Sequence, residues 1–71
     1  MFIIQRTTKA GSKYTGDECV TIEEAKAVCA ERTAGKVLTN DESENNFRLE
    51  VCEVLPDGNL KVVHATGFFE E

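Results

Sequence analysis

Residues 47–66 constrain the fold more than any other stretch, because two alternating runs flank the turn segment Leu55-Pro56-Asp57-Gly58-Asn59. Proline at the first turn position, aspartate at the second and glycine where the backbone is left-handed are typical of a type I turn with a glycine bulge. Such a turn decides which residues of the two strands lie opposite each other, and this register decides which side chains share a face. The sequence therefore predicts a β-hairpin with a defined register.

The predicted register begins with Leu55 opposite Asn59 and divides the hairpin into two faces. The further opposed pairs are Glu53 and Lys61, Cys52 and Val62, Val51 and Val63, and Glu50 and His64. The first face, with an ion pair between Glu53 and Lys61 at its turn end, carries Phe47, Leu49, Val51, Val63 and Ala65. The second face carries Arg48, Glu50, Cys52, Val54, Leu60, Val62 and His64.

A helix over 22–34 is predicted from the segment Thr21-Ile22-Glu23-Glu24, which has the pattern of a capping box. In this motif the Thr21 side chain accepts a hydrogen bond from the Glu24 amide, and the Glu24 side chain reaches back to Thr21. Gly35 is suited to the C-terminal cap. One stripe at helical spacing should face the sheet: Ile22, Ala25, Val28 and Cys29.

The remaining segments supply strands. Residues 2–8 have the composition of a strand, and residues 14–20 form a weaker returning strand that Gly16 and Asp17 interrupt. Residues 36–39 are either a short strand or a segment that covers the core. The sequence thus predicts one α+β domain over residues 1–71, with an antiparallel sheet of about four strands, a single helix on one face, and the order β-β-α-β-β.

One helix covers only one face of such a sheet, so the second face of the hairpin needs an explanation. Two interpretations stay open for its apolar members Cys52, Val54, Leu60 and Val62. Either Tyr14 or the Phe68-Phe69 tail folds over them, or they form an interface with a second copy or another partner.

Composition narrows the class of function. Thirteen acidic residues against eight Lys and Arg give a net charge of −5, which disfavours direct binding to nucleic acid through a basic patch. The negative charge instead favours solubility, binding to a basic protein partner, or occupation of a groove that normally holds phosphates. No apolar run has the length of a membrane span, and the start Met1-Phe2-Ile3-Ile4 is too short for a signal peptide. Three widely spaced cysteines fit a reducing cytoplasm better than a disulfide framework.

Cys19, Cys29, Cys52 and His64 are the candidates for a zinc site or for nucleophilic catalysis. Structural zinc sites draw on Cys-x-x-Cys pairs, which the sequence lacks, and Cys52 and His64 lie two residues out of register on the hairpin. The simpler interpretation is that the thiols are buried and that His64 forms a cross-strand pair with Glu50. We therefore expect no enzyme, no metal and no cofactor.

The acidic residues gather in groups that could contact a partner. Glu24 and Glu31 are seven residues apart and share the solvent face of the predicted helix, with Glu23 beside them, and Asp41, Glu42 and Glu44 crowd one loop. They are either a solvated surface or a negative footprint for a basic surface, on which carboxylates form charge-assisted, often bidentate bonds with arginine. The residues predicted to bind a partner are Glu23, Glu24, Glu31, Asp41, Glu42 and Glu44.

The order of elements resembles that of the phage-encoded inhibitors of host defence, including the anti-CRISPR proteins. The matching features are the initial strand in Met1 to Thr8, the helix start Thr21-Ile22-Glu23-Glu24-Ala25 and the hairpin turn Pro56-Asp57-Gly58. This resemblance implies a small cytoplasmic protein that binds a host protein or ribonucleoprotein complex without catalysis. The same helix start is similar to that of the HicB-type antitoxins, which implies a toxin-binding domain as the alternative.

Overall fold

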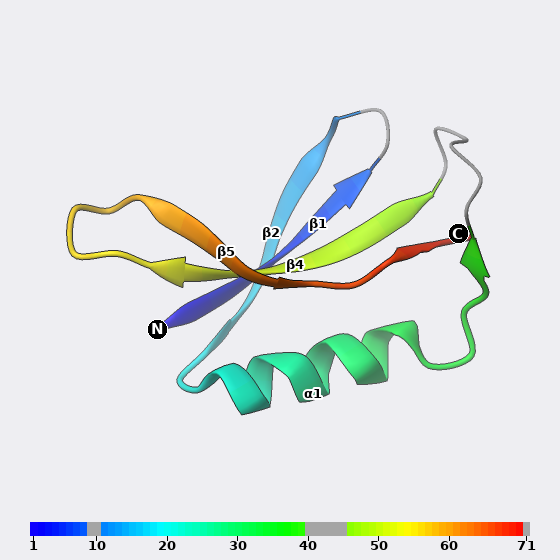
Figure 1. Ribbon diagram of the computed structural model, residues 1–71, viewed down its shortest axis with the longest axis horizontal. Helices are drawn as coiled ribbons and strands as arrows, with labels where there is room; N and C mark the ends of the chain where they lie inside the picture. Colours follow the sequence, from blue (N-terminus) through cyan, green and yellow to red (C-terminus); the bar gives the residue numbers. More distant parts are fainter. Residues whose placement is uncertain (9–10, 40–45, 71) are drawn as a thin grey trace.

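The computed structural model describes residues 1–8, 11–39 and 46–70, and these form a six-stranded antiparallel sheet with one α-helix against it (Figure 1). The smallest dimension is 15 Å, so the molecule is only two layers deep. The α+β class and the single helix on one face are confirmed, and two short strands add to the four main ones. The elements are β1 (Phe2–Thr8), β2 (Lys13–Cys19), α1 (Ile22–Thr33), β3 (Leu38–Thr39), β4 (Phe47–Val54), β5 (Leu60–Ala65) and β6 (Phe68–Phe69).

Strand β4 lies at the centre of the sheet. It pairs with β1 along its whole length on one side, and on the other side it pairs with β5 and, at a single position, with β6. The order across the sheet is β2-β1-β4-β6-β3, with β5 beside β4 in the half of that edge that β6 leaves open. The β4–β5 hairpin therefore projects beyond the rest of the sheet at one end of the molecule (Figure 1).

Helix α1 begins as the sequence predicts. Thr21 has an extended backbone, and its side-chain oxygen accepts a hydrogen bond from the Glu24 amide at 3.2 Å. This is one half of the capping box, since the Glu24 side chain forms no hydrogen bond back to Thr21 in the described chain. The helix ends at Thr33 with Ala34 as its C-cap, and Gly35 follows at a φ of 77°, a left-handed conformation that glycine adopts without steric cost.

The core lies between α1 and the face of the sheet that the helix covers. Ile4 lies opposite Val51 and Arg6 opposite Leu49, and opposed residues of paired strands share a face. The buried cluster consists of Ile4, Cys19, Ala25, Cys29, Phe47, Leu49 and Val51, with Phe2, Val28, Val63 and Phe69 packed against it. The predicted inward stripe of the helix is confirmed at Ala25, Val28 and Cys29.

The hairpin turn has the predicted geometry. The Gly58 amide donates to the Leu55 carbonyl and the Leu55 amide donates to the Asn59 carbonyl, both at 2.9 Å, while Gly58 has a φ of 87°. Next to the turn, Glu53 lies opposite Lys61 and Cys52 opposite Val62, as predicted. Glu53 and Lys61 are both described but form no ion pair, so that part of the prediction is wrong.

Beyond Cys52 the predicted register is wrong, because β5 contains a β-bulge at Val63. Val51 lies opposite His64, and Glu50 lies opposite Ala65. His64 is thereby placed on the face of Val51, and Ala65 on the opposite face. A bulge adds one residue to a single strand, so every later position of that strand changes its partner.

Candidate functional site

The three predicted partner-binding residues of the helix lie in solvent. Glu23, Glu24 and Glu31 are all exposed, and none of them forms a salt bridge with another described residue. A helix rises about 1.5 Å per residue, so the Cα atoms of Glu24 and Glu31 are about 10 Å apart along the axis. The other exposed positions of α1 and its C-cap are two basic residues and three small alanines: Lys26, Arg32, Ala27, Ala30 and Ala34.

The other predicted acidic positions differ from the helix acids. Asp41, Glu42 and Glu44 lie outside the described residues, so their place in the footprint stays a prediction. Asp17, on β2, forms an ion pair with Arg32 of the last turn of α1. This contact ties the edge strand to the helix and occupies the Asp17 carboxylate within the protein.

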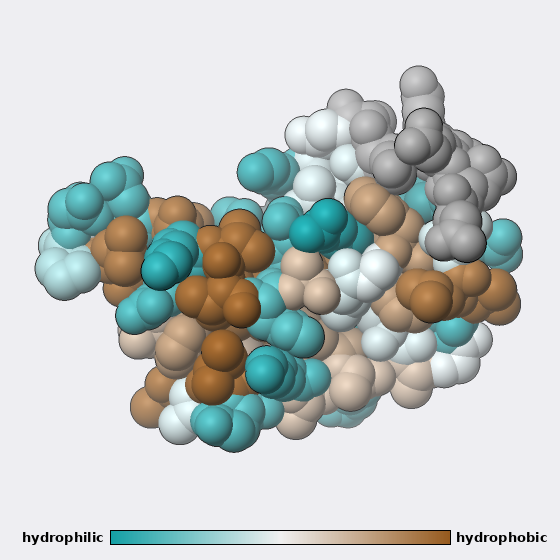
Figure 2. Space-filling model, in the orientation of Figure 1, coloured by the Kyte–Doolittle hydropathy of each residue, from teal (hydrophilic) through white to brown (hydrophobic). Residues whose placement is uncertain are grey.

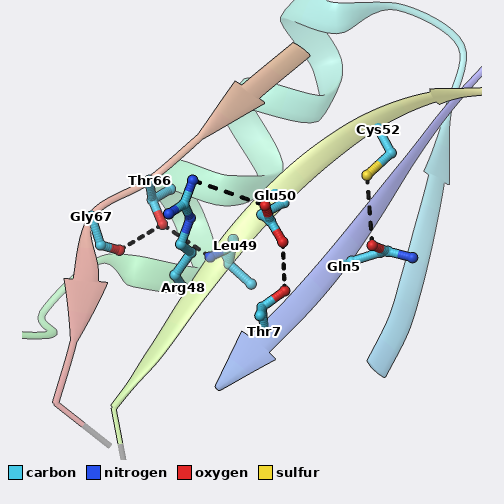
Figure 3. A network of polar contacts seen from close by, with 8 residues as sticks. All are labelled: Gln5, Thr7, Arg48, Leu49, Glu50, Cys52, Thr66 and Gly67. Atoms are coloured by element: carbon cyan, nitrogen blue, oxygen red, sulfur yellow. Dashed lines mark hydrogen bonds and ion pairs between the residues drawn. The ribbon is translucent and has the colours of Figure 1, made fainter. Parts of the chain in front are cut away.

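The second face of the sheet carries a polar network instead of a continuous apolar surface (Figure 3). The Thr7 hydroxyl donates to Glu50 Oε1 at 2.6 Å, and Arg48 Nη2 lies 3.9 Å from Glu50 Oε2. The Cys52 thiol donates to Gln5 Oε1 at 3.6 Å. Glu50 therefore pairs with Thr7 and Arg48, and the predicted pair with His64 is wrong because the bulge places Ala65 opposite Glu50.

A second set of contacts in Figure 3 joins β4 to the segment between β5 and β6. The Leu49 amide donates to the Thr66 hydroxyl at 3.0 Å, and the Thr66 amide donates to the Leu49 carbonyl at 2.9 Å. The Thr66 hydroxyl in turn donates to the Gly67 carbonyl at 2.9 Å. Thr66 thus holds the chain against β4 where the ladder is interrupted, and β6 continues along the same edge.

The question of what covers the second face has two answers. Phe68 covers one end, where the Arg48 guanidinium lies 5.7 Å from the centre of its ring. Tyr14 does not cover this face, because it pairs with Arg6 on the opposite one and is 61% exposed. At the hairpin end Leu60 and Val62 remain 43% and 49% exposed, and hydrophobic surface gathers over this hairpin in Figure 2.

The thiols are buried and unpaired in disulfides. Cys19 and Cys29 belong to the core, whereas Cys52 lies on the second face. Burial raises the pKa of all three thiols, and the nearby Glu24 adds to the effect at Cys19. A protonated thiol is a poor nucleophile and a poor metal ligand. Among the described residues no group of three Cys, His, Asp or Glu side chains converges on a common point that could hold a metal.

Sequence reasoning missed a basic pocket on the helix side of the sheet. Its volume is about 250 Å³, and the residues lining it come from β1, β4, the last turn of α1 and the segment after it: Arg6, Arg32, Lys36, Phe47 and Leu49. In the sequence these cations are isolated, and only the antiparallel pairing of β1 with β4 beneath the helix end brings them together. No local pattern signals the pocket.

Comparison with protein families, with curated proteins and with solved structures finds no match to this chain. The helix of the described structure is too short and too polar to cross a membrane.

Proposed function

We propose that this is a non-enzymatic, cytoplasmic binding protein that uses the acidic solvent face of α1 to dock on a basic surface of a host protein or nucleoprotein complex. The observation that carries the proposal is that Glu23, Glu24 and Glu31 are exposed and form no salt bridge with any residue that the structure describes. The net charge of −5 gives the whole molecule the same sign as this face, which speeds association with a positively charged partner.

The surroundings of the candidate nucleophiles, the three thiols, agree better with binding than with catalysis. The described thiols are buried, and a nucleophile needs both an accessible position and a base within hydrogen-bond reach. A phage-type inhibitor that occupies a basic groove needs only a rigid element that presents carboxylates, and the capped helix α1 fulfils this requirement. Asp41, Glu42 and Glu44 complete the proposed footprint.

The test compares two double charge reversals with the same effect on net charge. Glu24→Lys with Glu31→Lys alters the helix face, whereas Glu18→Lys with Glu70→Lys alters exposed acids on β2 and after β6. Tagged wild type and both variants are used in affinity pull-downs from bacterial lysate, with and without nuclease, and mass spectrometry identifies the proteins recovered. Circular dichroism confirms that each variant is folded.

We expect wild type and the Glu18/Glu70 variant to recover the same basic partner, and the Glu24/Glu31 variant to lose it. The interaction should also weaken at high salt, because exposed ion pairs are screened. Recovery of that partner by the Glu24/Glu31 variant at wild-type yield would show that the helix acids are not the footprint.

A second candidate function, a self-associating module, is favoured by the exposed apolar end of the hairpin. Leu60 and Val62 lie on β5, whose outer edge pairs with no strand among the described residues. An open edge with apolar side chains is a template for pairing with a second copy. Sedimentation velocity should then show a dimer that Val62→Lys dissociates, and a wild type that stays monomeric at high concentration would exclude this candidate.

A further inference from the structure

An apolar hollow lies at the end of the sheet where the chain turns into α1. Its volume is about 320 Å³, and its mainly apolar lining comes from the start of β1 and the end of β2: Met1, Glu18, Cys19 and Val20. Phe2 pairs with Cys19, so Met1 and Val20 are the next residues beyond that pair on the two strands. Figure 2 shows hydrophobic surface beside the start of α1, in agreement with this position.

The walls of the hollow are apolar side chains that stay in solvent. Val20 is 80% exposed and Met1 64%, the highest values among the exposed large hydrophobic residues of the described chain, whereas Cys19 beneath them is buried. Both walls are held in place by the backbone. The Met1 carbonyl accepts a hydrogen bond from the Val54 amide at 3.0 Å, and Val20 directly precedes the helix cap at Thr21. An open apolar concavity on a fixed backbone is typical of a surface that buries a partner's side chain.

A carboxylate of the acidic helix face stands next to the hollow. The Glu24 amide donates to the Thr21 hydroxyl at 3.2 Å, which holds Glu24 one helical turn from Val20. Burial raises the pKa of the Cys19 thiol, and the negative charge of nearby Glu24 raises it further. Glu18 contributes mainly methylene groups, because the lining is mainly apolar, and a lysine at this position would supply similar groups. The charge beside the hollow is therefore that of the proposed acidic footprint.

A large apolar side chain flanked by basic residues matches this combination best. Burial of the apolar side chain supplies binding energy, and the exposed carboxylates beside it favour lysine or arginine in the surrounding surface of the partner. Protein interfaces commonly combine an apolar anchor in a central pocket with a charged rim. A volume of about 320 Å³ lies at the lower end of the range of about 300–1,000 Å³ for ligand pockets, which suits a single side chain.

We propose that the hollow receives a large apolar side chain of the basic partner, such as leucine or phenylalanine, with lysine or arginine next to it at Glu24. Val20 and Met1 form the contact surface. The choice of a basic partner rests on the proposed function, whereas the apolar anchor is a contact that the acidic footprint does not require. In this arrangement the helix acids attract the partner, and the hollow fixes its position along the helix.

Titrations of ¹⁵N-labelled protein with short capped peptides test the proposal. Two peptides place leucine or phenylalanine between two pairs of lysines, and a control peptide of equal charge has serine at the centre. The hollow is altered by Val20→Gln, with Val37→Gln as the matched control, because Val37 is also an exposed valine and does not line the hollow. Val20→Thr keeps the shape of the side chain and serves if Val20→Gln disturbs the fold. The double variant Glu24→Lys with Glu31→Lys tests the acids in the same assay.

We expect saturable shifts of the Glu18, Cys19 and Val20 amides with the leucine or the phenylalanine peptide. The serine peptide should bind at least about fivefold more weakly, as expected when a partly buried apolar side chain is lost. Val20→Gln should weaken binding of the apolar peptides by a similar factor, and Val37→Gln should change it by less than about twofold. The Glu24/Glu31 variant should bind all three peptides more weakly, because all carry the same charge.

Three results would overturn the inference. Equal affinity for the serine and the apolar peptides would exclude the hollow, and a loss of both in the Glu24/Glu31 variant would show that the acidic footprint still stands. Equal weakening by Val20→Gln and Val37→Gln, or no saturable shift at the hollow with any peptide, would exclude it as well. A preference for the apolar peptides at unchanged affinity in the Glu24/Glu31 variant would instead contradict the acidic footprint and the basic partner.

Discussion

The hydrogen bond between Thr7 and Glu50 offers a direct test of the sheet register. It joins β1 to β4 across 43 residues of sequence, and its length of 2.6 Å is the usual one for a hydroxyl that donates to a carboxylate. The Glu50 side chain is 14% exposed, so water can replace the lost donor only in part. Thr7→Val removes the hydroxyl and keeps the shape of the side chain.

The expected cost follows from these contacts. A hydrogen bond to a charged group contributes about 1.5–3 kcal/mol, and the partial access of water to Glu50 favours the lower value of about 1.5 kcal/mol. In a domain of this size that loss corresponds to a decrease in Tm of about 6–12 °C. The Arg48–Glu50 contact, at 3.9 Å and partly exposed, should contribute only about 0.5 kcal/mol.

A double-mutant cycle of Thr7→Val and Glu50→Ala, measured by urea unfolding, isolates the interaction from other effects of each change. We expect a coupling energy of about 1.5 kcal/mol. The control cycle pairs Glu50→Ala with His64→Ala and should give a coupling within about 0.3 kcal/mol of zero, because the bulge at Val63 places His64 opposite Val51. The reverse result, strong coupling to His64 and none to Thr7, would refute the register.

Three further predictions concern the stability of the fold. Thr21→Ala should lower the free energy of unfolding by about 1 kcal/mol, because the Thr21 hydroxyl accepts a hydrogen bond from the Glu24 amide of the helix. Thr21→Ser keeps this hydroxyl and should have nearly the stability of the wild type, and thermal melts of the two variants test the difference. Gly16→Ala should lower the free energy of unfolding by about 1–2 kcal/mol, because the added Cβ would lie 3.1 Å from the Ile4 carbonyl oxygen and push β2 away from β1. An unchanged midpoint of urea unfolding would contradict this prediction. Burial raises the pKa of the Cys19 and Cys29 thiols in the folded state, so above about pH 9 the unfolded chain binds fewer protons than the folded one and stability should fall. Denaturation midpoints across this range, with Cys29→Ala as the control, test the direction.

Local patterns predicted the elements whose geometry depends on neighbouring residues. The turn at Gly58 and the cap at Thr21 need only a few adjacent side chains, so the hairpin and the helix start could be identified from the sequence. The bulge could not, because Val63 and His64 resemble any other strand residues. It lies between two tertiary contacts with β4, the pairing of Val62 with Cys52 and the hydrogen bond from Thr66 to Leu49.

The basic pocket depended on tertiary structure entirely. Arg6 and Lys36 are thirty residues apart in number, and only the pairing of β1 with β4 brings Arg6 beneath the end of the helix. Similarly, Asp17 forms an ion pair with Arg32, whereas Glu31 forms none with a described residue. The spacing of these residues in the sequence does not predict this difference. The acidic composition was visible in the sequence, but which acids are free for a partner was not.

The central position of β4 has a consequence for how the chain folds. Among the described residues, strand pairing links the N-terminal hairpin of β1 and β2 to the C-terminal strands only through β4, which is itself distant in sequence from β1. Loop closure over such a separation is slow and brings little stabilisation until the strands meet, so the two ends of the protein become ordered together in one cooperative step. The amides of β4 should therefore be among the slowest to exchange with solvent, whereas the projecting hairpin tip can open without unfolding the sheet.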